Sequence, residues 1–203
     1  MSTNQDKTNY ISLFEIEKQK SLSQNDGNSV PLQGLGVLSS FEILKANSNA
    51  LRGTLTESLA DPITGSLAAD DQLLIKFHGT YQQQDRDYDE ERKKQKLEPL
   101  YSYLIRVRVP GGIATAQQWL DLDALADKYG DKTLKLTTRQ AFQLHGVLKR
   151  NLKTTMQDIN KTLLDTIAAC GDVNRNVMSS ANHLESSVHA EVAADAKRMT
   201  DSI

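Results

Sequence analysis

Apolar and polar side chains alternate most regularly in the middle of the chain. Between Tyr101 and Val109 every second residue is apolar, and Arg106 and Arg108 fall on the other side. Successive side chains of a β-strand point to opposite faces of its sheet, so this alternation predicts a half-buried strand. The Pro-Gly-Gly sequence at 110–112 predicts the end of the strand, because both residue types interrupt regular structure.

A second patterned stretch runs from Leu134 to Gly146 and predicts two strands, at 133–138 and 142–149, separated by a break near Gln140. In both strands the apolar residues form one face, which suits a core. The other face carries cationic and hydrogen-bonding side chains: Lys135, Thr137 and Arg139 before the break, and Gln143 and His145 after it. Because these groups bind negative charge, the pattern favours a large anion on this face.

Helical spacing of apolar residues appears in three places. Apolar residues at i, i+3, i+4 and i+7 predict a helix between a Thr115 cap and Gly130. A second helix is predicted from about Lys153 to Ala169. A third is predicted from about His183 to Ile203, and its apolar face has no visible partner in the sequence.

The elements before Tyr101 are less regular. Ser39 or Ser40 can cap a short helix, and residues 47–59 are predicted to be partly helical. The apolar run Leu73–His78, followed by a glycine, predicts a strand. Residues 85–96 carry evenly matched acidic and basic side chains, which is typical of a solvated face.

The order of elements from Tyr101 onward is strand, helix, strand, strand, helix, with a weak further strand at Val173. This order predicts an α+β fold, the ferredoxin-like split βαβ domain, with an antiparallel sheet and both helices on one face. The expected organisation is a flexible tail at 1–38, a wrapping segment with a short helix and strand at 39–97, a ferredoxin-like half-domain at 98–171, and the truncated start of a further domain at 172–203.

The composition excludes several classes of protein. With 24 Lys and Arg against 26 Asp and Glu in 203 residues, no overall field attracts nucleic acid or an anionic membrane. No apolar run approaches the length of a bilayer span, and the charged start of the chain does not resemble a secretory signal. Cys170 is the only cysteine, which excludes an internal disulfide and a multi-thiolate metal site within this chain. A cytoplasmic location is expected.

Several cations can converge on the polar face of the sheet: Arg106, Arg108, Lys135, Arg139, His145 and Lys149, with Arg175 after the second helix. Clustered cations repel one another and are costly to desolvate, so an anionic partner stabilises them. Arginine offers planar, bidentate forks to carboxylates and oxyanions, and Thr137, Gln143 and Asn174 add neutral donors. The alternative interpretation is that these are solvated surface charges paired with nearby acids.

Six stretches also resemble, in order, one known family: Asn47–Thr54 (NSNALRGT), Leu74–Asp87 (LIKFHGTYQQQDRD), Gln95–Pro99 (QKLEP), Arg106–Gly112 (RVRVPGG), Leu134–Gly146 (LKLTTRQAFQLHG) and Ala168–Met178 (AACGDVNRNVM). On these motifs the chain resembles the siroheme-dependent sulfite and nitrite reductases from about Ser39 onward. The resemblance is strongest to the hemoprotein β subunits of assimilatory, NADPH-linked sulfite reductases.

The resemblance implies a function and a set of site residues. The family binds siroheme, an iron tetrapyrrole fringed with carboxylates, beside a [4Fe–4S] cluster, and reduces sulfite to sulfide with six electrons. Arg106 and Arg175 match arginines that contact the sulfite oxygens and the distal side of the heme. The other residues that match the siroheme lining are Lys135, Thr137, Arg139, Gln143, His145 and Asn174. Lys135 stands where some members have Arg, which keeps the charge and loses the bidentate fork.

The resemblance also implies partners. The chain is expected to be the amino-terminal part of a longer reductase, with 172–203 as the start of the heme and cluster domain and the cluster cysteines in the missing carboxyl-terminal part. Alone it is expected to bind no metal and to be inactive. Electrons are expected from a flavoprotein subunit or a ferredoxin, and no nucleic acid or membrane is expected as a partner.

Three other functions remain open on the sequence. They are a nitrite reductase of the same family, a ferredoxin-like module that binds RNA or another anion, and a structural or regulatory remnant that docks on a partner subunit. An RNA-binding module would need exposed aromatic residues on its central strands, where this sequence has mainly Arg, Lys and Thr.

Overall fold

The computed structural model describes residues 39–170 and 175–202. The chain divides into two units, residues 1–47 and 48–203. The described part of the first unit is helix α2 (Ser40–Asn47), and the amide of Glu42 donates to Ser39 Oγ at 3.3 Å. The predicted capped helix is therefore confirmed. The tail expected at 1–38 lies outside the described residues.

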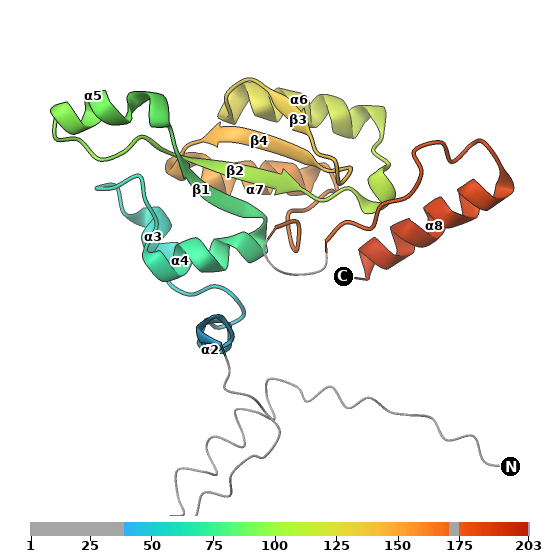
Figure 1. The fold of residues 1–203 in the computed structure, drawn as a ribbon, viewed down its shortest axis with the longest axis horizontal. Coiled ribbons are helices and arrows are strands. Elements are labelled where there is room, and N and C mark those ends of the chain that lie inside the picture. Colours follow the sequence, from blue (N-terminus) through green and yellow to red (C-terminus); the bar gives the residue numbers. More distant parts are fainter. Residues whose placement is uncertain (1–38, 171–174, 203) are drawn as a thin grey trace, which may run out of the picture. The chain divides into compact units, whose positions relative to one another are not determined.

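A four-stranded antiparallel sheet forms the centre of the second unit (Figure 1). Its strands are β1 (Thr80–Gln84), β2 (Tyr101–Val107), β3 (Leu134–Leu136) and β4 (Phe142–Val147), in the spatial order β1-β2-β4-β3. The last three lie within the ranges predicted from the sequence. The α+β, ferredoxin-like fold class is confirmed, with β2 and β4 as the central strands.

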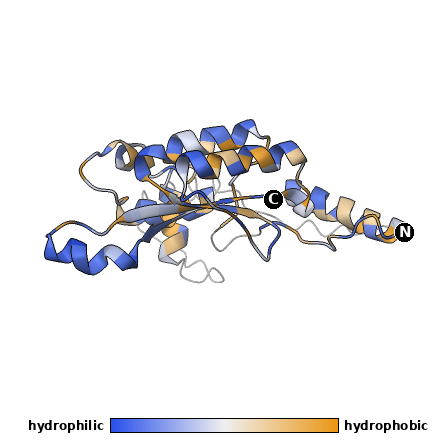
Figure 2. Cartoon of the chain, turned by 90° about the horizontal axis from the view of Figure 1, so that it is seen from above, coloured by the Kyte–Doolittle hydropathy of each residue, from blue (hydrophilic) through white to orange (hydrophobic). Residues whose placement is uncertain are grey.

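Two helices, α6 (Ala116–Tyr129) and α7 (Leu152–Lys161), cover one face of this sheet (Figures 1 and 2). Thr115 caps α6 as predicted. Its Oγ1 accepts from the Gln118 amide at 3.1 Å, and the Gln118 side chain accepts from the Thr115 amide at 2.9 Å. This reciprocal capping box satisfies backbone donors that the first turn of a helix leaves unpaired.

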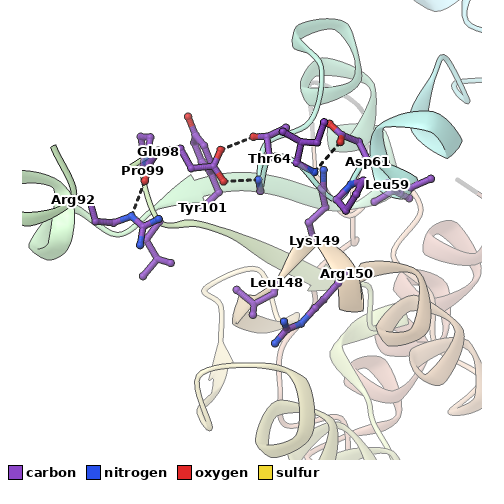
Figure 3. A pocket seen from close by; sticks show the side chains of 15 residues that line it. Leu59, Asp61, Thr64, Arg92, Glu98, Pro99, Tyr101, Leu148, Lys149 and Arg150 are labelled. Atoms are coloured by element: carbon purple, nitrogen blue, oxygen red, sulfur yellow. Dashed lines mark hydrogen bonds between the residues drawn. The ribbon is translucent and has the colours of Figure 1, made fainter. Parts of the chain in front are cut away.

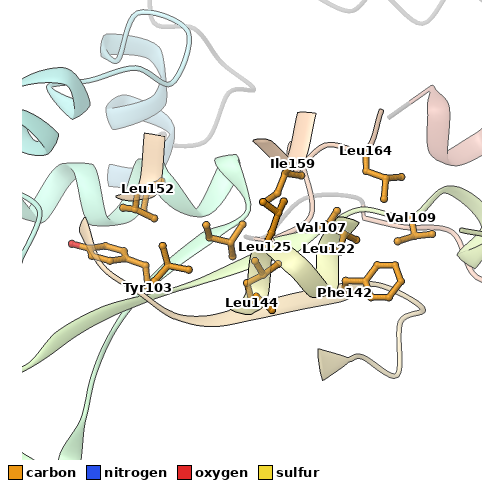
Figure 4. Packing of buried hydrophobic residues seen from close by; sticks show 14 of the residues in the cluster. Tyr103, Val107, Val109, Leu122, Leu125, Phe142, Leu144, Leu152, Ile159 and Leu164 are labelled. Carbon is orange, nitrogen blue, oxygen red and sulfur yellow. The ribbon is translucent and has the colours of Figure 1, made fainter. Parts of the chain in front are cut away.

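The core lies between these helices and the sheet (Figure 4). The apolar side predicted for β2 is buried, and so is Val109 just beyond the strand. Tyr103, Ile105, Val107 and Val109 are at most 2% exposed. They pack with side chains of α6, β4 and α7, among them Leu122, Leu125, Phe142, Leu144 and Ile159. Burying one such side chain contributes roughly 1.5–3 kcal/mol. The cluster therefore fixes which β2 residues point away from the core.

The strand predicted at Leu73–His78 is wrong. These residues form the end of helix α4 (Ala69–Leu74) and the 3₁₀ helix η1 (Ile75–His78). A short apolar run cannot distinguish a buried strand from a buried helix. Here the buried Asp71 anchors the helix, because its carboxylate accepts from the amide and the hydroxyl of Thr54 at 3.0 and 2.8 Å.

The outer neighbour of β2 was not predicted. It is β1, which pairs antiparallel with β2, while Asp165 adds an isolated bridge to Arg108. The weak strand expected at Val173 lies outside the described residues. β1 has the polar sequence TYQQQ and so lacks apolar alternation. Hydrogen bonding replaces it, since Gln82 Oε1 accepts from the Leu67 amide at 2.8 Å.

Helix α7 is shorter than the predicted Lys153–Ala169, because it ends at Lys161. Leu163 then takes a left-handed φ of 63° and is 90% exposed, and Ile167 is exposed as well. Both residues lie within the range of the predicted helix. The chain turns here instead, which buries Leu164.

Helix α8 (Ser187–Asp201) begins later than the predicted His183 and has a packing partner within the chain. Its Ala193 and Ala196 are buried, and its backbone lies close to Gly111 in the 3₁₀ helix η3 (Pro110–Gly112). The expectation of an apolar face without a visible partner is therefore wrong for Ala196, whereas the other described residues of that face remain exposed. Its exposed apolar residues are Val188, Val192 and Met199.

Short elements complete the unit: α3 (Leu55–Ala60), η2 (Arg86–Tyr88), α5 (Asp89–Lys94) and η4 (Lys149–Asn151). Helix α5 is hydrophilic along its length (Figure 2) and buries no residue. Its acidic residues stand in the first turn and its basic residues in the last, which complements the helix dipole. The solvated character predicted for this charge run is confirmed. No helix in the described part of the chain is long and apolar enough to cross a membrane.

Gly79 joins η1 to β1, and its substitution tests how the fold holds β2. Its φ is 77°, its carbonyl accepts from the Arg106 amide at 2.8 Å, and a Cβ would lie 2.2 Å from Thr166 O. We expect Gly79→Ala to lower the free energy of unfolding by about 3 kcal/mol, because left-handed strain and a backbone clash combine. Urea denaturation followed by circular dichroism measures this loss.

Gly65→Ala is the matched control. A Cβ on Gly65 meets no atom closer than 3.4 Å, and its φ is not positive. We expect this variant to lose less than about 1 kcal/mol. Equal losses in the two variants would contradict the role assigned to Gly79.

Candidate functional site

Three polar side chains form a row across the sheet, on the face opposite the core. Arg106 on β2 is paired with Gln143 on β4, and Gln143 is paired with Lys135 on β3. Directly opposed residues of antiparallel strands share one face. The register thus brings together three of the side chains that the alternation placed on the polar face.

The guanidinium of Arg106 is held by neutral acceptors. With the Gln143 amide oriented so that its oxygen faces donors, this oxygen accepts from Arg106 Nε at 2.9 Å and from Nη2 at 2.6 Å. Arg106 Nη1 donates to the carbonyl oxygen of Ala169 at 3.4 Å. The side chain is therefore fixed in direction, and no acidic side chain of residues 39–170 and 175–202 forms an ion pair with it.

His145 lies two residues further along β4, with Nε2 3.3 Å from the Gln143 amide. Burial lowers the pKa of His145, the positive charges of Lys135 and Arg106 act in the same direction, and Asp131 opposes them. The imidazole is therefore favoured in its neutral form, and a neutral imidazole both accepts and donates one hydrogen bond.

The turn between β3 and β4 carries the next predicted residues. Thr137 Oγ1 accepts from the amides of Arg139 and Ala141, both at 3.2 Å, so this hydroxyl shapes the turn. Arg139 stands on the turn with an exposed side chain. Lys135 is half-exposed, and its ammonium lies 3.7 Å from the Asp131 carboxylate. Such an exposed pair contributes little to stability, so Lys135 remains available to a ligand.

A cavity of about 500 Å³ adjoins this turn. Its lining comes from the turn, from residues 175–178 and from the end of α8: Arg139, Arg175, Asn176, Val177, Met178, Met199 and Ser202. Asn176 Nδ2 donates to the carbonyls of Arg139 and Gln140 at 3.1 and 3.0 Å, which joins two sides of the cavity. Its buried Oδ1 has no hydrogen-bond partner among the described residues.

Cys170 lies close enough to Arg106 and to Arg175 for both positive charges to influence its thiol. Burial raises the pKa of the Cys170 thiol to about 11, while both guanidinium charges and a hydrogen bond with Tyr81 act in the other direction. Two arginines that act on one fully buried thiol lie on the same side of the unit. The predicted distal pair, Arg106 and Arg175, is thus brought into one neighbourhood.

Two cations that the sequence placed with this cluster lie elsewhere. Arg108 forms an ion pair with Asp165 at 2.9 Å and donates to the carbonyl of Thr200 near the end of α8 at 3.0 Å, so its role is structural. Lys149 is buried and donates to the carbonyl of Ser66 at 3.2 Å. Asn174 lies outside the described residues.

A second cavity, of about 370 Å³, lies beside the end of α3 and the loop 61–65 (Figure 3). Both of its carboxylates are already engaged. Glu98 accepts from the Thr64 hydroxyl at 2.6 Å and from the Gly65 amide at 2.7 Å, and Asp61 accepts from the Ile63 amide at 2.8 Å. The hydrogen bonds to Glu98 keep the pKa of its carboxyl below its usual value. Of the cations that the sequence placed on the polar face, Lys149 alone lines this cavity, so the sheet face and the cavity beside Arg139 remain the candidate site.

Tyr81 and Asn176 were not predicted to lie at the site. Tyr81 lies on β1 opposite Leu104, the residue between the buried Tyr103 and Ile105, and that strand was not predicted. Asn176 stands one residue after Arg175, and the segment that carries it has no regular structure. No periodicity could have indicated either residue.

Together the site offers guanidinium, ammonium, amide and hydroxyl donors. Within the described ranges, neither Arg106, Arg139 nor Arg175 forms an ion pair with an acidic side chain. Charge-assisted hydrogen bonds to carboxylates and oxyanions are the chemistry that such groups perform best. The arrangement therefore suits a ligand with several negative charges.

Comparison with known proteins identifies this fold. A family model described as the nitrite/sulfite reductase ferredoxin-like half domain matches residues 95–162. Similar proteins include the sulfite reductase [NADPH] hemoprotein beta-component of Staphylococcus haemolyticus, 58% identical over 164 residues, and that of Xylella fastidiosa, 60% identical over 163 residues. These alignments cover 81% and 80% of this chain and 29% of each relative.

A solved structure agrees with this result. The Mycobacterium tuberculosis NirA protein matches with a TM-score of 0.60 and 25% identity, over 75% of this chain and 29% of its own length. Residues 95–162 therefore match the ferredoxin-like half domain of nitrite and sulfite reductases, and the chain is similar to proteins of that family. It spans less than a third of the length of the relatives it matches.

The reactivity of Cys170 tests whether this residue is buried beside the site. Because burial raises the pKa of this thiol to about 11, and only the thiolate is a good nucleophile, we expect iodoacetamide to label it very slowly at pH 8. Labelling in urea at the same pH should be faster by at least about tenfold. Mass spectrometry measures both rates on the one cysteine of the chain. Equally rapid labelling of the folded chain would contradict the described packing.

Proposed function

We propose that this chain forms part of a sulfite reductase hemoprotein and supplies the basic face of its siroheme and sulfite pocket. The observation that carries the proposal is the Arg106–Gln143–Lys135 row on one sheet face, close to a cavity that Arg139 and Arg175 line. The identity of 58–60% with sulfite reductase hemoproteins supports sulfite over nitrite as the substrate.

The donor set fits siroheme. The cofactor is fringed with carboxylates, and the site presents cations that no described acidic residue pairs, apart from the exposed contact of Lys135. The buried, unpartnered Oδ1 of Asn176 is a further polar atom that a ligand can satisfy. We assign the carboxylates to Lys135, Thr137, Arg139, Gln143, His145 and Asn174, with Arg106 and Arg175 on the substrate side. Thr137 acts through the turn it shapes. When bound, siroheme supplies the redox chemistry.

Arg106 and Arg175 act on the sulfite oxygens in this proposal. Their guanidinium groups donate hydrogen bonds and stabilise negative charge on an oxygen whose bond to sulfur is breaking. Arginine keeps its proton at all ordinary pH values, so these residues orient and stabilise while the protons come from elsewhere. The hydrogen bonds of Arg106 to Gln143 and Ala169 fix its direction before substrate arrives, which lowers the cost of binding.

The [4Fe–4S] cluster does not fit this chain. Such clusters are held by cysteine thiolates, and the chain has one cysteine, which is buried with a raised pKa. The cluster ligands therefore belong to polypeptide beyond these residues, in keeping with the 29% coverage of the relatives. We propose that the chain alone is inactive and that an NADPH-linked flavoprotein or a ferredoxin delivers electrons; the names of the relatives favour NADPH.

A chimera tests the proposed function. Residues 39–202 of this chain replace the matching segment of the Staphylococcus haemolyticus relative, and the visible spectrum and sulfite-dependent sulfide formation are measured. We expect the chimera to bind siroheme and to form sulfide. Arg106→Ala or Arg175→Ala should lower kcat by about 10²–10³-fold, the loss typical of removing one donor to a developing oxyanion.

The control is Arg150→Ala, which removes an exposed arginine beside the second cavity. It should leave sulfide formation close to the unsubstituted chimera. Full activity of the Arg106→Ala and Arg175→Ala chimeras would refute the assigned roles. Sulfide formation by the 203-residue chain without added protein would refute its predicted inactivity.

A further inference from the structure

The side-chain amide of Gln143 lies between Arg106 and His145, and both can form hydrogen bonds with it. On one side Arg106 presents two N–H donors, 2.9 and 2.6 Å from the position of the amide oxygen. On the other side His145 Nε2 lies 3.3 Å from the remaining amide atom. An amide has one acceptor atom and one donor atom, so its oxygen can face only one of these neighbours.

We propose that Gln143 is a positioning residue whose amide orientation couples the protonation state of His145 to the hold on Arg106. With neutral His145, the Gln143 oxygen accepts from Arg106 and the amide nitrogen donates to the bare Nε2. With protonated His145, Nε2 becomes a donor and competes with Arg106 for the same oxygen. This inference deepens the proposed function and rests on it only for the role of Arg106 in binding sulfite.

The geometry specifies the histidine tautomer. If the Gln143 nitrogen donates to Nε2, then the proton of the neutral imidazole is on Nδ1. The opposite tautomer would place an N–H against the NH₂ of the amide, with two donors facing each other. The proposal is therefore falsifiable in the neutral state alone, before any titration.

The charged groups around His145 are on three segments. Lys135 on β3 and Arg106 on β2 disfavour a further positive charge, whereas Asp131, in the turn before β3, favours it. Asp131 also holds the strand, since its amide donates to the His145 carbonyl at 2.8 Å. Burial is the largest influence and adds to the effect of the two cations.

The sign of the pH dependence follows from these influences. The pKa of His145 in the folded chain lies below its ordinary value of 6.5, so the unfolded chain takes up the proton first as pH falls. Stability is therefore complete above pH 6.5 and decreases as pH falls from there through the folded-state pKa. The folded chain takes up this proton only around its own, lower pKa, and there Arg106 loses its acceptor to His145.

Nuclear magnetic resonance of the isolated 203-residue chain tests the coupling without any cofactor. The imidazole ¹⁵N signals of His145, assigned by their loss in His145→Phe, report tautomer and pKa, and the Arg106 Nε–H signal reports its hydrogen bond. We expect the Nδ1–H tautomer at pH 8, a pKa below 6.5, and an Arg106 Nε–H shift that follows the His145 titration. In His145→Phe the Arg106 signal should not titrate between pH 5 and pH 8.

Two substitutions separate positioning from mere structure. Gln143→Leu removes both contacts, and we expect exchange of Arg106 Nε–H with water to rise at least about tenfold, as the loss of a hydrogen bond to a charged group predicts. Gln143→Glu supplies acceptors to both neighbours, so it should keep Arg106 protected and raise the pKa of His145. Gln157→Leu, at an exposed position on α7, is the matched control and should change neither signal.

Each outcome decides the proposal. An Nε2–H tautomer at pH 8, or an Arg106 signal that ignores the His145 titration in the wild-type chain, would overturn it even if Gln143→Leu failed to fold. Failure of the proposed function is distinguishable, because it would show as an Arg106→Ala chimera with full sulfide formation while the coupled titration persisted.

Discussion

The pairing of β2 with β4 is the constraint on which the site depends. Its inner side packs Tyr103, Ile105 and Val107 against the two helices, with these residues fully buried. A shift of β2 by one residue would turn this whole set toward the other face. The core therefore fixes the register, and the same register places Arg106 opposite Gln143. Hydrophobic burial, which is not directional in itself, thus aligns a polar row on the opposite face.

The sequence predicted what periodicity can encode. Alternation located β2 and β4, and the Thr115 cap located the start of α6, because both patterns follow directly from backbone geometry. The run at 73–78 was misjudged, since Asp71 and Thr54 stabilise a helix there through contacts distant in sequence. β1 was missed because an edge strand held by Gln82 needs no apolar alternation. Elements fixed by individual long-range hydrogen bonds leave no periodic signal.

The same distinction applies to the candidate site. Alternation placed Lys135, Gln143 and His145 on one face, and the register agrees. It could not separate Arg106 from Arg108, two residues of equal type and parity on one strand. The ion pair of Arg108 with Asp165 makes that separation, and it depends on the turn after α7, which the sequence had predicted as helix. The positions of the charged side chains were thus predictable from the sequence. Which of them forms an ion pair with an acidic residue was not.

The way each arginine is held distinguishes binding from structure. Arg108 is paired with a carboxylate, which cancels its charge and suits it to joining β2 with α8. Arg106 is held by a neutral amide and a neutral carbonyl, which fix its direction and leave its charge for a ligand. A neutral tether is also the one that a neighbouring histidine can disturb, because an amide can turn whereas a carboxylate accepts on every side. Because a neutral amide, and not a carboxylate, fixes the direction of Arg106, the hydrogen bond between Gln143 and Arg106 is sensitive to the protonation of His145.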